Sequence, residues 1–391
     1  MKLKFSLLSL ILTFIALYSC NKESVKIAVS NTTDSEIGTR VIEVKAKEVF
    51  SRLNSKGFYV TDEKGDEIPS QFTSDSLIIF KALVPAGKTY IYQINPSDSI
   101  HHYPSTVEGR LYPERRDDLA YENELVGFRI YGPSTQKAGE KVYGYDLFFK
   151  YPTEELVVPQ LYANQTSDIL WARVDSLRKI NNDLAEEFIK SFTYHIDHGK
   201  GMDCYAVGAT LGAGVAALIE NDSIIYPWCY QNVKILDNGP LRFTVLLEFP
   251  VFNFDNTPIK EKRLISLDSD SFLNSCKVWF ESLNNPTVIV TGFPLRDSSE
   301  PYFQPKKGIL AYADPTQGPD NGKALLGVKT KMQADSVVIK DNHILLSYQL
   351  NPSDTFDYKW GFSWDKTEIP NMEEWIGYLE NSDLEYSVVV K

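Results

Sequence analysis

Alternating apolar and polar positions dominate the chain and predict an all-β protein. Runs of this kind fill residues 24–95, among them VKIAVSN, TRVIEV and TYIYQIN, and polar turns such as DEKGDE separate them. A period of two places successive side chains on opposite faces, so these runs predict half-buried antiparallel strands. Residues 20–95 therefore predict a small N-terminal β-domain. Residues 96–110 are polar, contain two prolines and predict a linker.

The same alternation recurs in longer runs from residue 121 onward, of which PLRFTVLLEFPVF and FLNSCKVWFES are typical. Two stretches, residues 168–192 and 372–380, instead carry apolar residues three and four positions apart and predict helices. Many long antiparallel strands in a segment of this size predict one large two-sheet sandwich over residues 111–391. The predicted fold is thus a large antiparallel sandwich with a small N-terminal β-domain and one or two short helices.

The first twenty residues predict an export signal. Two lysines precede an apolar run at residues 5–17, and Leu-Tyr-Ser-Cys follows at residues 17–20. The run is too short for a permanent membrane-spanning helix, and residues 17–20 resemble a lipoprotein box. We therefore expect removal of residues 1–19 and lipidation of Cys20, which would anchor the protein at a membrane in the periplasm or at the outer membrane. A plain secretory signal cleaved nearby is the alternative.

The remaining cysteines are Cys204, Cys229 and Cys276, whose spacing forms no metal motif. Three cysteines cannot all pair, so the sequence favours three buried thiols, with a single disulfide as the alternative.

Composition narrows the class of protein further. With 43% hydrophobic and 24% charged residues the chain of 391 residues is an ordinary globular protein. Its net charge of −12 leaves no basic excess to replace the counterions of a phosphate backbone, so nucleic acid is not an expected partner. A small anionic substrate is still possible, because a local arginine cluster can oppose the overall field.

The densest polar segment is YPERRDDLAYENE at residues 112–124, directly before a predicted strand. Loops at the mouth of a sandwich commonly build binding sites, and paired arginines can hold a carboxylate through two hydrogen bonds. Arg115 and Arg116 are therefore candidates for binding an anionic substrate. The same segment offers Tyr121 as a catalytic candidate, and further substrate-binding candidates in Asp118, Glu122 and Asn123. A solvated turn with mutually cancelling charges is the alternative.

A second segment, YHIDHGKGMDCY at residues 194–205, holds two of the five histidines. Flanking glycines would let the backbone approach a ligand at Lys200, a substrate-binding candidate. His198 is a candidate base and Tyr205 a candidate proton donor. His195, His198 and Asp197 could instead bind a metal, although their spacing matches no named zinc motif, and surface or core histidines are equally compatible.

Trp360 and Trp364 alternate in a predicted strand and could stack on a sugar ring, although core packing explains the same spacing. The chain has no nucleotide-binding loop, nucleophile elbow or HExxH motif, and we expect no cofactor.

Four runs, YPERRDDLAYENELVGFRIYGP, VYGYDLFFKYP, DHGKGMDCYAVGATLGAG and GPLRFTVLLEFP, resemble the domain-of-unknown-function 4861 family over roughly residues 105–390. The strand succession around residues 239–280 is similar to that of mutarotase-like sandwiches. Members of the family are exported proteins of polysaccharide-degrading bacteria. The resemblance implies an ulvan-type oligosaccharide dehydratase, which removes water from a terminal glucuronic or iduronic acid. The 4,5-unsaturated uronate that results would be a substrate for an unsaturated glucuronyl hydrolase.

This elimination needs a cation at the uronate carboxylate, a base for the proton on carbon 5 and an acid for the departing 4-hydroxyl. The paired arginines would supply the cation. His198 would be the base, with Tyr205 or Lys200 as alternatives. Tyr205 or Tyr121 would protonate the departing 4-hydroxyl. Two alternatives stay open: a glycoside hydrolase using Asp118 and Glu122 as a carboxylate pair, and a non-catalytic sugar-binding lipoprotein.

Overall fold

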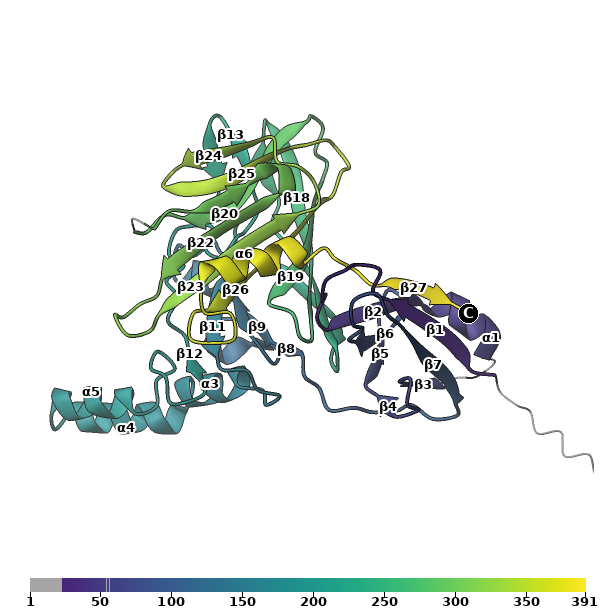
Figure 1. The fold of residues 1–391 in the computed structure, drawn as a ribbon. Helices are drawn as coiled ribbons and strands as arrows, with labels where there is room; N and C mark the ends of the chain where they lie inside the picture. The colour runs from purple at the N-terminus through teal and green to yellow at the C-terminus, as the bar shows by residue number, and fades with distance from the viewer. Residues whose placement is uncertain (1–22, 54, 56, 298) are drawn as a thin grey trace, which may run out of the picture.

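The computed structural model describes residues 23–391 except residues 54, 56 and 298. The predicted signal peptide and Cys20 lie outside the described residues. The described part comprises a small β-domain, a large β-sandwich and a pair of helices that projects from the sandwich (Figure 1). No helix among the described residues has the length and apolar character needed to cross a bilayer.

The small domain is built from both ends of the described chain. One of its sheets has the strand order β27-β1-β7-β3-β4 and the other has the order β2-β6-β5. Its elements are β1 (Val25–Ser30), β2 (Arg40–Lys45), α1 (Ala46–Leu53), β3 (Gly57–Thr61), β4 (Glu67–Ile68), β5 (Ser70–Phe72), β6 (Leu77–Ala82), β7 (Thr89–Ser97) and β27 (Ser387–Val390). Because Ile27 of β1 pairs with Val390 of β27, the end of the chain lies in the small domain and not in the predicted large domain of residues 111–391.

The large domain is an antiparallel sandwich, which confirms the predicted fold class. One layer is a nine-stranded sheet of β15 (Asn232–Asn238), β16 (Arg242–Glu248), β17 (Phe252–Phe254), β18 (Thr257–Asp268), β19 (Leu273–Glu281), β26 (Phe356–Trp364), β23 (Lys323–Thr330), β22 (Ile309–Pro315) and β21 (Tyr302–Gln304).

Two five-stranded sheets supply the facing layer. The first contains β8 (Glu108–Tyr112), β9 (Asp118–Glu122), β10 (Gly127–Ile130), β11 (Asp146–Lys150) and β12 (Gly201–Met202). The second contains β13 (Ala217–Glu220), β14 (Ser223–Ile225), β20 (Thr287–Pro294), β24 (Ser336–Lys340) and β25 (His343–Leu350). Side chains of all three sheets form one buried apolar core. Within it, Phe128 of β10 meets Trp360 of β26 edge to face at 4.9 Å.

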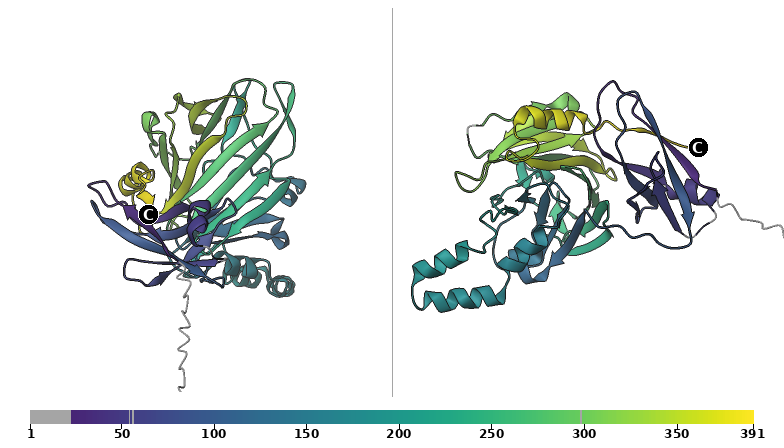
Figure 2. Two further views of the ribbon diagram at one scale, coloured as in Figure 1. Left: turned by 90° about the vertical axis from the view of Figure 1, so that its right-hand side faces the viewer. Right: turned by 60° about the horizontal axis from the view of Figure 1, so that its bottom comes forward.

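The predicted helices are present. Residues 168–192 form α4 (Asp168–Arg178) and α5 (Asn182–Lys190), which project from the sandwich as a hairpin (Figures 1 and 2). Ser167 and Asn181 begin the two helices, and each accepts a backbone N–H in its side-chain oxygen. Residues 372–380 lie in α6 (Met372–Asn381), which buries Trp375 on the outer side of β23.

The pleat of β9 determines which side chains are available for chemistry. Leu119 and Tyr121 point into the sandwich core. Asp118, Ala120 and Glu122 point to the opposite face, where Ala120 packs in a separate cluster with α3 (Val158–Gln165) and Tyr194. The polar side chains of this sheet are therefore gathered beneath α3 and the segment before β12.

Candidate functional site

A buried ion cluster occupies this covered face. Arg129 on β10 lies opposite Asp146 on β11 in the sheet register. Its Nε donates a hydrogen bond to Asp146 Oδ2 at 2.7 Å, and its Nη2 donates to Asp203 Oδ2 at 2.8 Å. All three side chains are almost completely buried. One guanidinium thus faces two carboxylates, and we call these three residues the Arg129 cluster.

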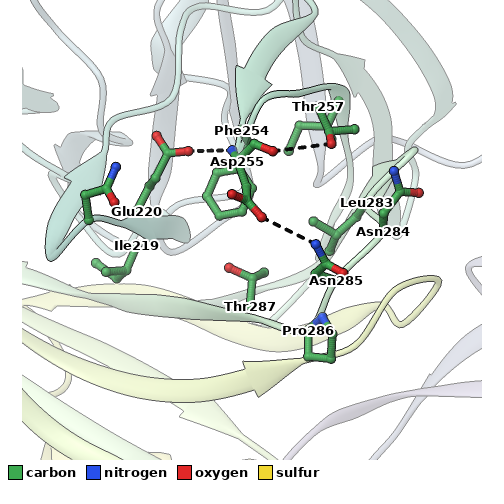
Figure 3. A pocket seen from close by; sticks show the side chains of 12 residues that line it. Ile219, Glu220, Phe254, Asp255, Thr257, Leu283, Asn284, Asn285, Pro286 and Thr287 are labelled. Atoms are coloured by element: carbon green, nitrogen blue, oxygen red, sulfur yellow. Dashed lines mark hydrogen bonds between the residues drawn. The ribbon is translucent and has the colours of Figure 1, made fainter.

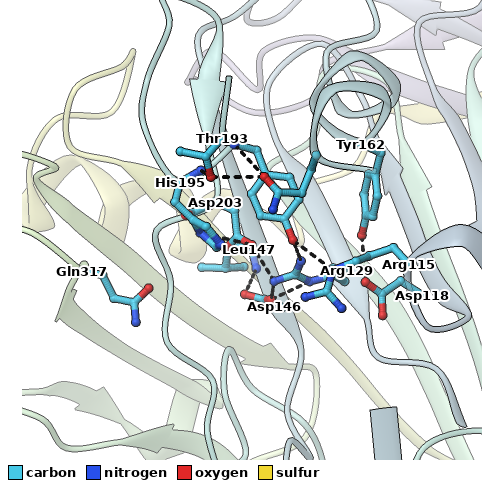
Figure 4. A network of polar contacts seen from close by, with 12 residues as sticks. Arg115, Asp118, Arg129, Asp146, Leu147, Tyr162, Thr193, His195, Asp203 and Gln317 are labelled. Carbon is cyan, nitrogen blue, oxygen red and sulfur yellow. Dashed lines mark hydrogen bonds and ion pairs between the residues drawn. The ribbon is translucent and has the colours of Figure 1, made fainter. Parts of the chain in front are cut away.

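Two tyrosines and a second arginine extend the Arg129 cluster, and Figure 4 shows the second arginine, Arg115, beside Arg129. The hydroxyl of Tyr131 donates to Asp146 Oδ2 at 2.5 Å and accepts from Arg129 Nη2 at 3.0 Å. The hydroxyl of Tyr194 accepts from Arg129 Nη1 and from Arg115 Nε, both at 3.3 Å. Arg115 is only partly buried and has no carboxylate within 4.0 Å among the described residues. Its terminal nitrogens can therefore receive a carboxylate from a ligand.

His195 lies at the rim of the same network, and its side chain is 52% exposed. Its Nδ1 is 2.9 Å from the main-chain oxygen of Asp203 and 3.9 Å from Asp203 Oδ2. A carbonyl oxygen only accepts, so Nδ1 carries the hydrogen and Nε2 keeps a free lone pair. This arrangement suits His195 to remove a proton from a ligand.

Burial determines the protonation states in the network. It raises the pKa of Asp203 to about 6, against the opposing effect of Arg129. It raises the pKa of Asp118 as well, against Arg129 and Arg115. Burial also raises the pKa of Tyr131 well above its ordinary value, so this phenol holds its proton at neutral pH.

Four predicted site residues are buried in the apolar core instead: Tyr205, which is described below, and the three residues Tyr121, Trp360 and Trp364. Tyr121 stacks on Phe243 at 4.8 Å and its hydroxyl lacks a hydrogen-bond partner. Trp360 stacks on Tyr145, and Trp364 is equally buried. None of the three can contact an oligosaccharide, so their predicted roles are wrong. The alternation of Trp360 and Trp364, which suggested stacking on a sugar ring, reflects core packing.

Glu122 and Asn123 serve the structure. Glu122 forms a buried ion pair with Lys150 at 2.6 Å and accepts the backbone N–H groups of Val157 and Val158 at the start of α3. Asn123 donates to the main-chain oxygens of residues 268 and 271 and accepts two N–H groups of its own turn. Because these contacts occupy both side chains, neither is free for a ligand. The carboxylate pair of Asp118 and Glu122 proposed for a hydrolase is therefore inaccessible.

The other predicted residues divide between the network and the surface. Arg115 and Asp118 belong to the network, where Asp118 Oδ2 accepts from Tyr162 at 3.2 Å. Arg116 forms an ion pair with Glu140, and Lys200 forms one with Glu155.

His198 and Tyr205 lie apart from each other. His198 is exposed and its Nε2 is 3.1 Å from the main-chain oxygen of Thr193. Tyr205 is buried beneath the guanidinium of Arg296, 5.1 Å from the ring centre. No hydrogen bond or ring contact joins either residue to Tyr121 within the described chain.

Sequence reasoning missed Arg129, Tyr131 and Asp146. The available signal was the pair of apolar strands FRIYG and YDLFF, each interrupted by a charged residue. A charged side chain in a predicted buried strand needs an oppositely charged partner. When two such strands carry opposite charges, each can supply the partner of the other.

Neither a metal centre nor a reactive disulfide adds to the chemistry of the described residues. Within the described ranges, no group of three or more His, Cys, Asp or Glu side chains is arranged to hold a metal ion. Cys204, Cys229 and Cys276 are unpaired and buried, which confirms the predicted thiols. A pocket of about 220 Å³ near β13 and β20 contains Glu220 and Asp255 but no basic residue, so it does not suit a uronate (Figure 3).

Comparison with known proteins gave three kinds of match. The model of the family described as domain of unknown function DUF4861 matches residues 29–390. A relative named "Uncharacterized protein P7", from Formosa agariphila, is 26% identical, with 95% of each chain covered.

Two solved structures from Enterococcus faecalis are also similar. An alpha-mannosidase shares 8% identity at a TM-score of 0.49, and a protein of glycosyl hydrolase family 38 shares 7% at 0.50. The match covers 94% of this chain but only 46% and 47% of theirs, so the chain spans about half their length. At such identity the second likeness indicates a related fold alone.

Proposed function

We propose that this chain, which belongs to the DUF4861 family, is a carbohydrate-active enzyme of the hydro-lyase class. Its substrate would be an oligosaccharide that ends in a saturated glucuronic or iduronic acid, such as a fragment of ulvan. One observation carries the proposal: an available arginine, a protonated tyrosine and a histidine with a free nitrogen surround the same buried Arg129 cluster.

Arg115 binds the carboxylate of the terminal uronate. Its guanidinium neutralises this group and stabilises the negative charge that develops on it when carbon 5 loses its proton. Tyr194 holds Arg115 through Nε and leaves its terminal nitrogens for the substrate. The partly buried position strengthens this attraction, because less water screens it.

His195 and Tyr131 move the protons. Nε2 of His195 takes the proton from carbon 5, and the electrons of that bond form the double bond between carbons 4 and 5. The bond from carbon 4 to its hydroxyl breaks, and Tyr131 gives its proton to the leaving oxygen, which departs as water. Arg129 Nη2, 3.0 Å from the phenolic oxygen, stabilises the phenolate as it forms. Proton transfer from His195 to Tyr131 through solvent restores both residues.

Mass spectrometry of saturated uronate-terminated oligosaccharides incubated with the protein tests the proposal. Loss of one water from intact oligomers, together with the ultraviolet absorption of an unsaturated uronate, is the expected result. Shortened oligomers would instead indicate a hydrolase, and unchanged oligomers that still bind would indicate a sugar-binding protein. The unsaturated product would then pass to a hydrolase specific for unsaturated glucuronyl residues.

Replacement of Arg115 by Ala is expected to lower kcat/KM about ten- to a hundred-fold. A hydrogen bond to a charged group contributes roughly 1.5–3 kcal/mol, and each 1.36 kcal/mol is about ten-fold in rate. Arg116→Ala is the matched control, since Arg116 pairs with Glu140 at the surface and should keep near-normal kinetics. Equal effects of the two substitutions would remove Arg115 from the carboxylate site.

We also propose that the mature protein is a lipoprotein anchored through Cys20. The Cys20→Ser variant is expected to lose the lipid and appear in the soluble fraction, while the unchanged protein stays with membranes. Fractionation followed by mass spectrometry of the N-terminal peptide measures this. An unchanged protein that is already fully soluble would contradict the proposed anchor.

A further inference from the structure

A large cleft lies between the small domain and the outer face of the nine-stranded sheet. Its volume is about 790 Å³, within the range of roughly 300–1,000 Å³ typical of ligand sites. β2, the turn at residues 74–75 and residues 382–386 all contribute to its lining. Because the Arg129 cluster lies in the facing layer of the sandwich, the cleft is a separate site on the other face of the large domain.

A row of small hydroxyl side chains forms the floor of the cleft. Thr244, Ser266 and Ser275 lie opposite one another on the adjacent strands β16, β18 and β19. Neighbouring strands are about 4.8 Å apart, so the three hydroxyls follow one another at that interval. None of them forms a hydrogen bond within the described part of the chain, although all three line the cleft. Each can therefore donate to and accept from a ligand.

The charged side chains along the cleft are mostly paired with each other. At one end, Lys329 and Lys359 bind the carboxylate of Asp383 at 2.8 and 3.1 Å. At the other end, Arg242 binds Asp268 at 2.5 Å and Glu43 at 2.7 Å. The lining thus offers hydroxyls and compensated charges in place of a basic patch. This chemistry suits an uncharged, hydroxyl-rich chain better than a polyanion.

Apolar contact is available beside the hydroxyl row. Leu264 on β18 and Tyr378 on α6 line the cleft and are half-buried. The C–H faces of sugar rings pack on such side chains while their hydroxyls bond to the serines and the threonine. Both components of a saccharide surface therefore find partners in one cleft.

We propose that this interdomain cleft binds neutral sugar residues of a linear glycan, as a second site remote from the Arg129 cluster. The choice of a glycan rests on the proposed carbohydrate function, but the site makes no use of the groups that perform the elimination. The cleft would hold the protein on its polymer while the other face processes free ends.

Binding of the neutral pentasaccharides xylopentaose and cellopentaose, measured by calorimetry, tests the proposal without any need for turnover. Ser266→Trp fills the floor and is expected to weaken binding at least about ten-fold, which corresponds to about 1.4 kcal/mol. Ser275→Trp, on the neighbouring strand, provides a second variant if the first fails to fold. Lys234→Trp is the control, because Lys234 is exposed on β15 and lies outside the cleft lining.

The outcomes separate this site from the proposed activity. Loss of binding in both filled variants, with retention in the control and normal thermal unfolding, supports the cleft. Equal binding in all variants, or no binding of either pentasaccharide to the unchanged protein, overturns it. The proposal is also overturned if the two filled variants lose binding of a uronate pentasaccharide but bind the neutral pentasaccharides as the unchanged protein does. If the protein does not dehydrate its oligosaccharides, the proposed function is refuted. The binding results still test the cleft, because they do not depend on turnover.

Discussion

His195→Ala is expected to lower the turnover of a uronate-terminated oligosaccharide about 10²–10⁴-fold, the usual contribution of a positioned base. The Asp203 carbonyl oxygen, 2.9 Å from Nδ1, fixes the tautomer that leaves Nε2 free. The side chain is half exposed, so its removal should leave the unfolding free energy nearly unchanged. Ultraviolet absorption of the unsaturated product measures the rate, and thermal unfolding verifies the fold.

His198→Ala is the matched control from the same segment. Its imidazole is exposed, and the only hydrogen bond of its Nε2 within the described chain is to the Thr193 carbonyl. We expect near-normal turnover in this variant. If His198→Ala lost activity and His195→Ala kept it, His198 would be the base, as the sequence predicted, and the assignment of His195 would be wrong. His195→Gln keeps a hydrogen bond but takes no proton, so it should be as slow as His195→Ala.

Arg129→Met is expected to lower the free energy of unfolding by about 3–5 kcal/mol. Arg129 is 3% exposed, and its guanidinium compensates the buried carboxylates of Asp146 and Asp203. Its removal leaves two buried acids without a counter-charge, which is the costly way to break a buried ion pair. The midpoint and slope of urea unfolding measure the change.

A second substitution separates charge from packing in that result. Adding Asp203→Asn to Arg129→Met removes one uncompensated carboxylate and should recover part of the lost stability. Arg116→Met replaces a surface arginine and should change stability by no more than about 0.5 kcal/mol. If Arg129→Met unfolded at the same urea concentration as the unchanged protein, the Arg129 cluster could not be a source of stability.

The strands of the sandwich and the helices at residues 168–192 and 372–380 followed from local patterns, whereas α1, α3 and the pairing of the strands did not. Alternation identified the strands of the sandwich, and the three- and four-residue period identified α4, α5 and α6. The run EYSVVVK reads as a strand, but nothing local says that it pairs with β1 more than three hundred residues earlier. Pairing across such distances depends on which edge the rest of the fold leaves open.

The site was predictable only where polar residues cluster in sequence. Arg115 and Asp118 were found because they stand in a dense polar segment, and Tyr121 was included although the pleat of β9 turns it into the core. Arg129 and Asp146 each stand alone in an apolar strand. They can be recognised as an ion pair only when the register of β10 and β11 places them opposite each other. Single charges in buried strands therefore deserve as much weight as charged runs.

The pairing of β27 with β1 has a consequence for biosynthesis. Tyr386 fastens the same region, since its hydroxyl donates to the Gly38 carbonyl at 2.7 Å and accepts from the Val84 N–H at 3.0 Å. While residues 386–390 are still in the ribosome, β1 is an open edge that can pair with other chains. The first domain to be synthesised is thus the last to be completed. This edge of β1 stays unpaired until residues 386–390 have left the ribosome and β27 can form.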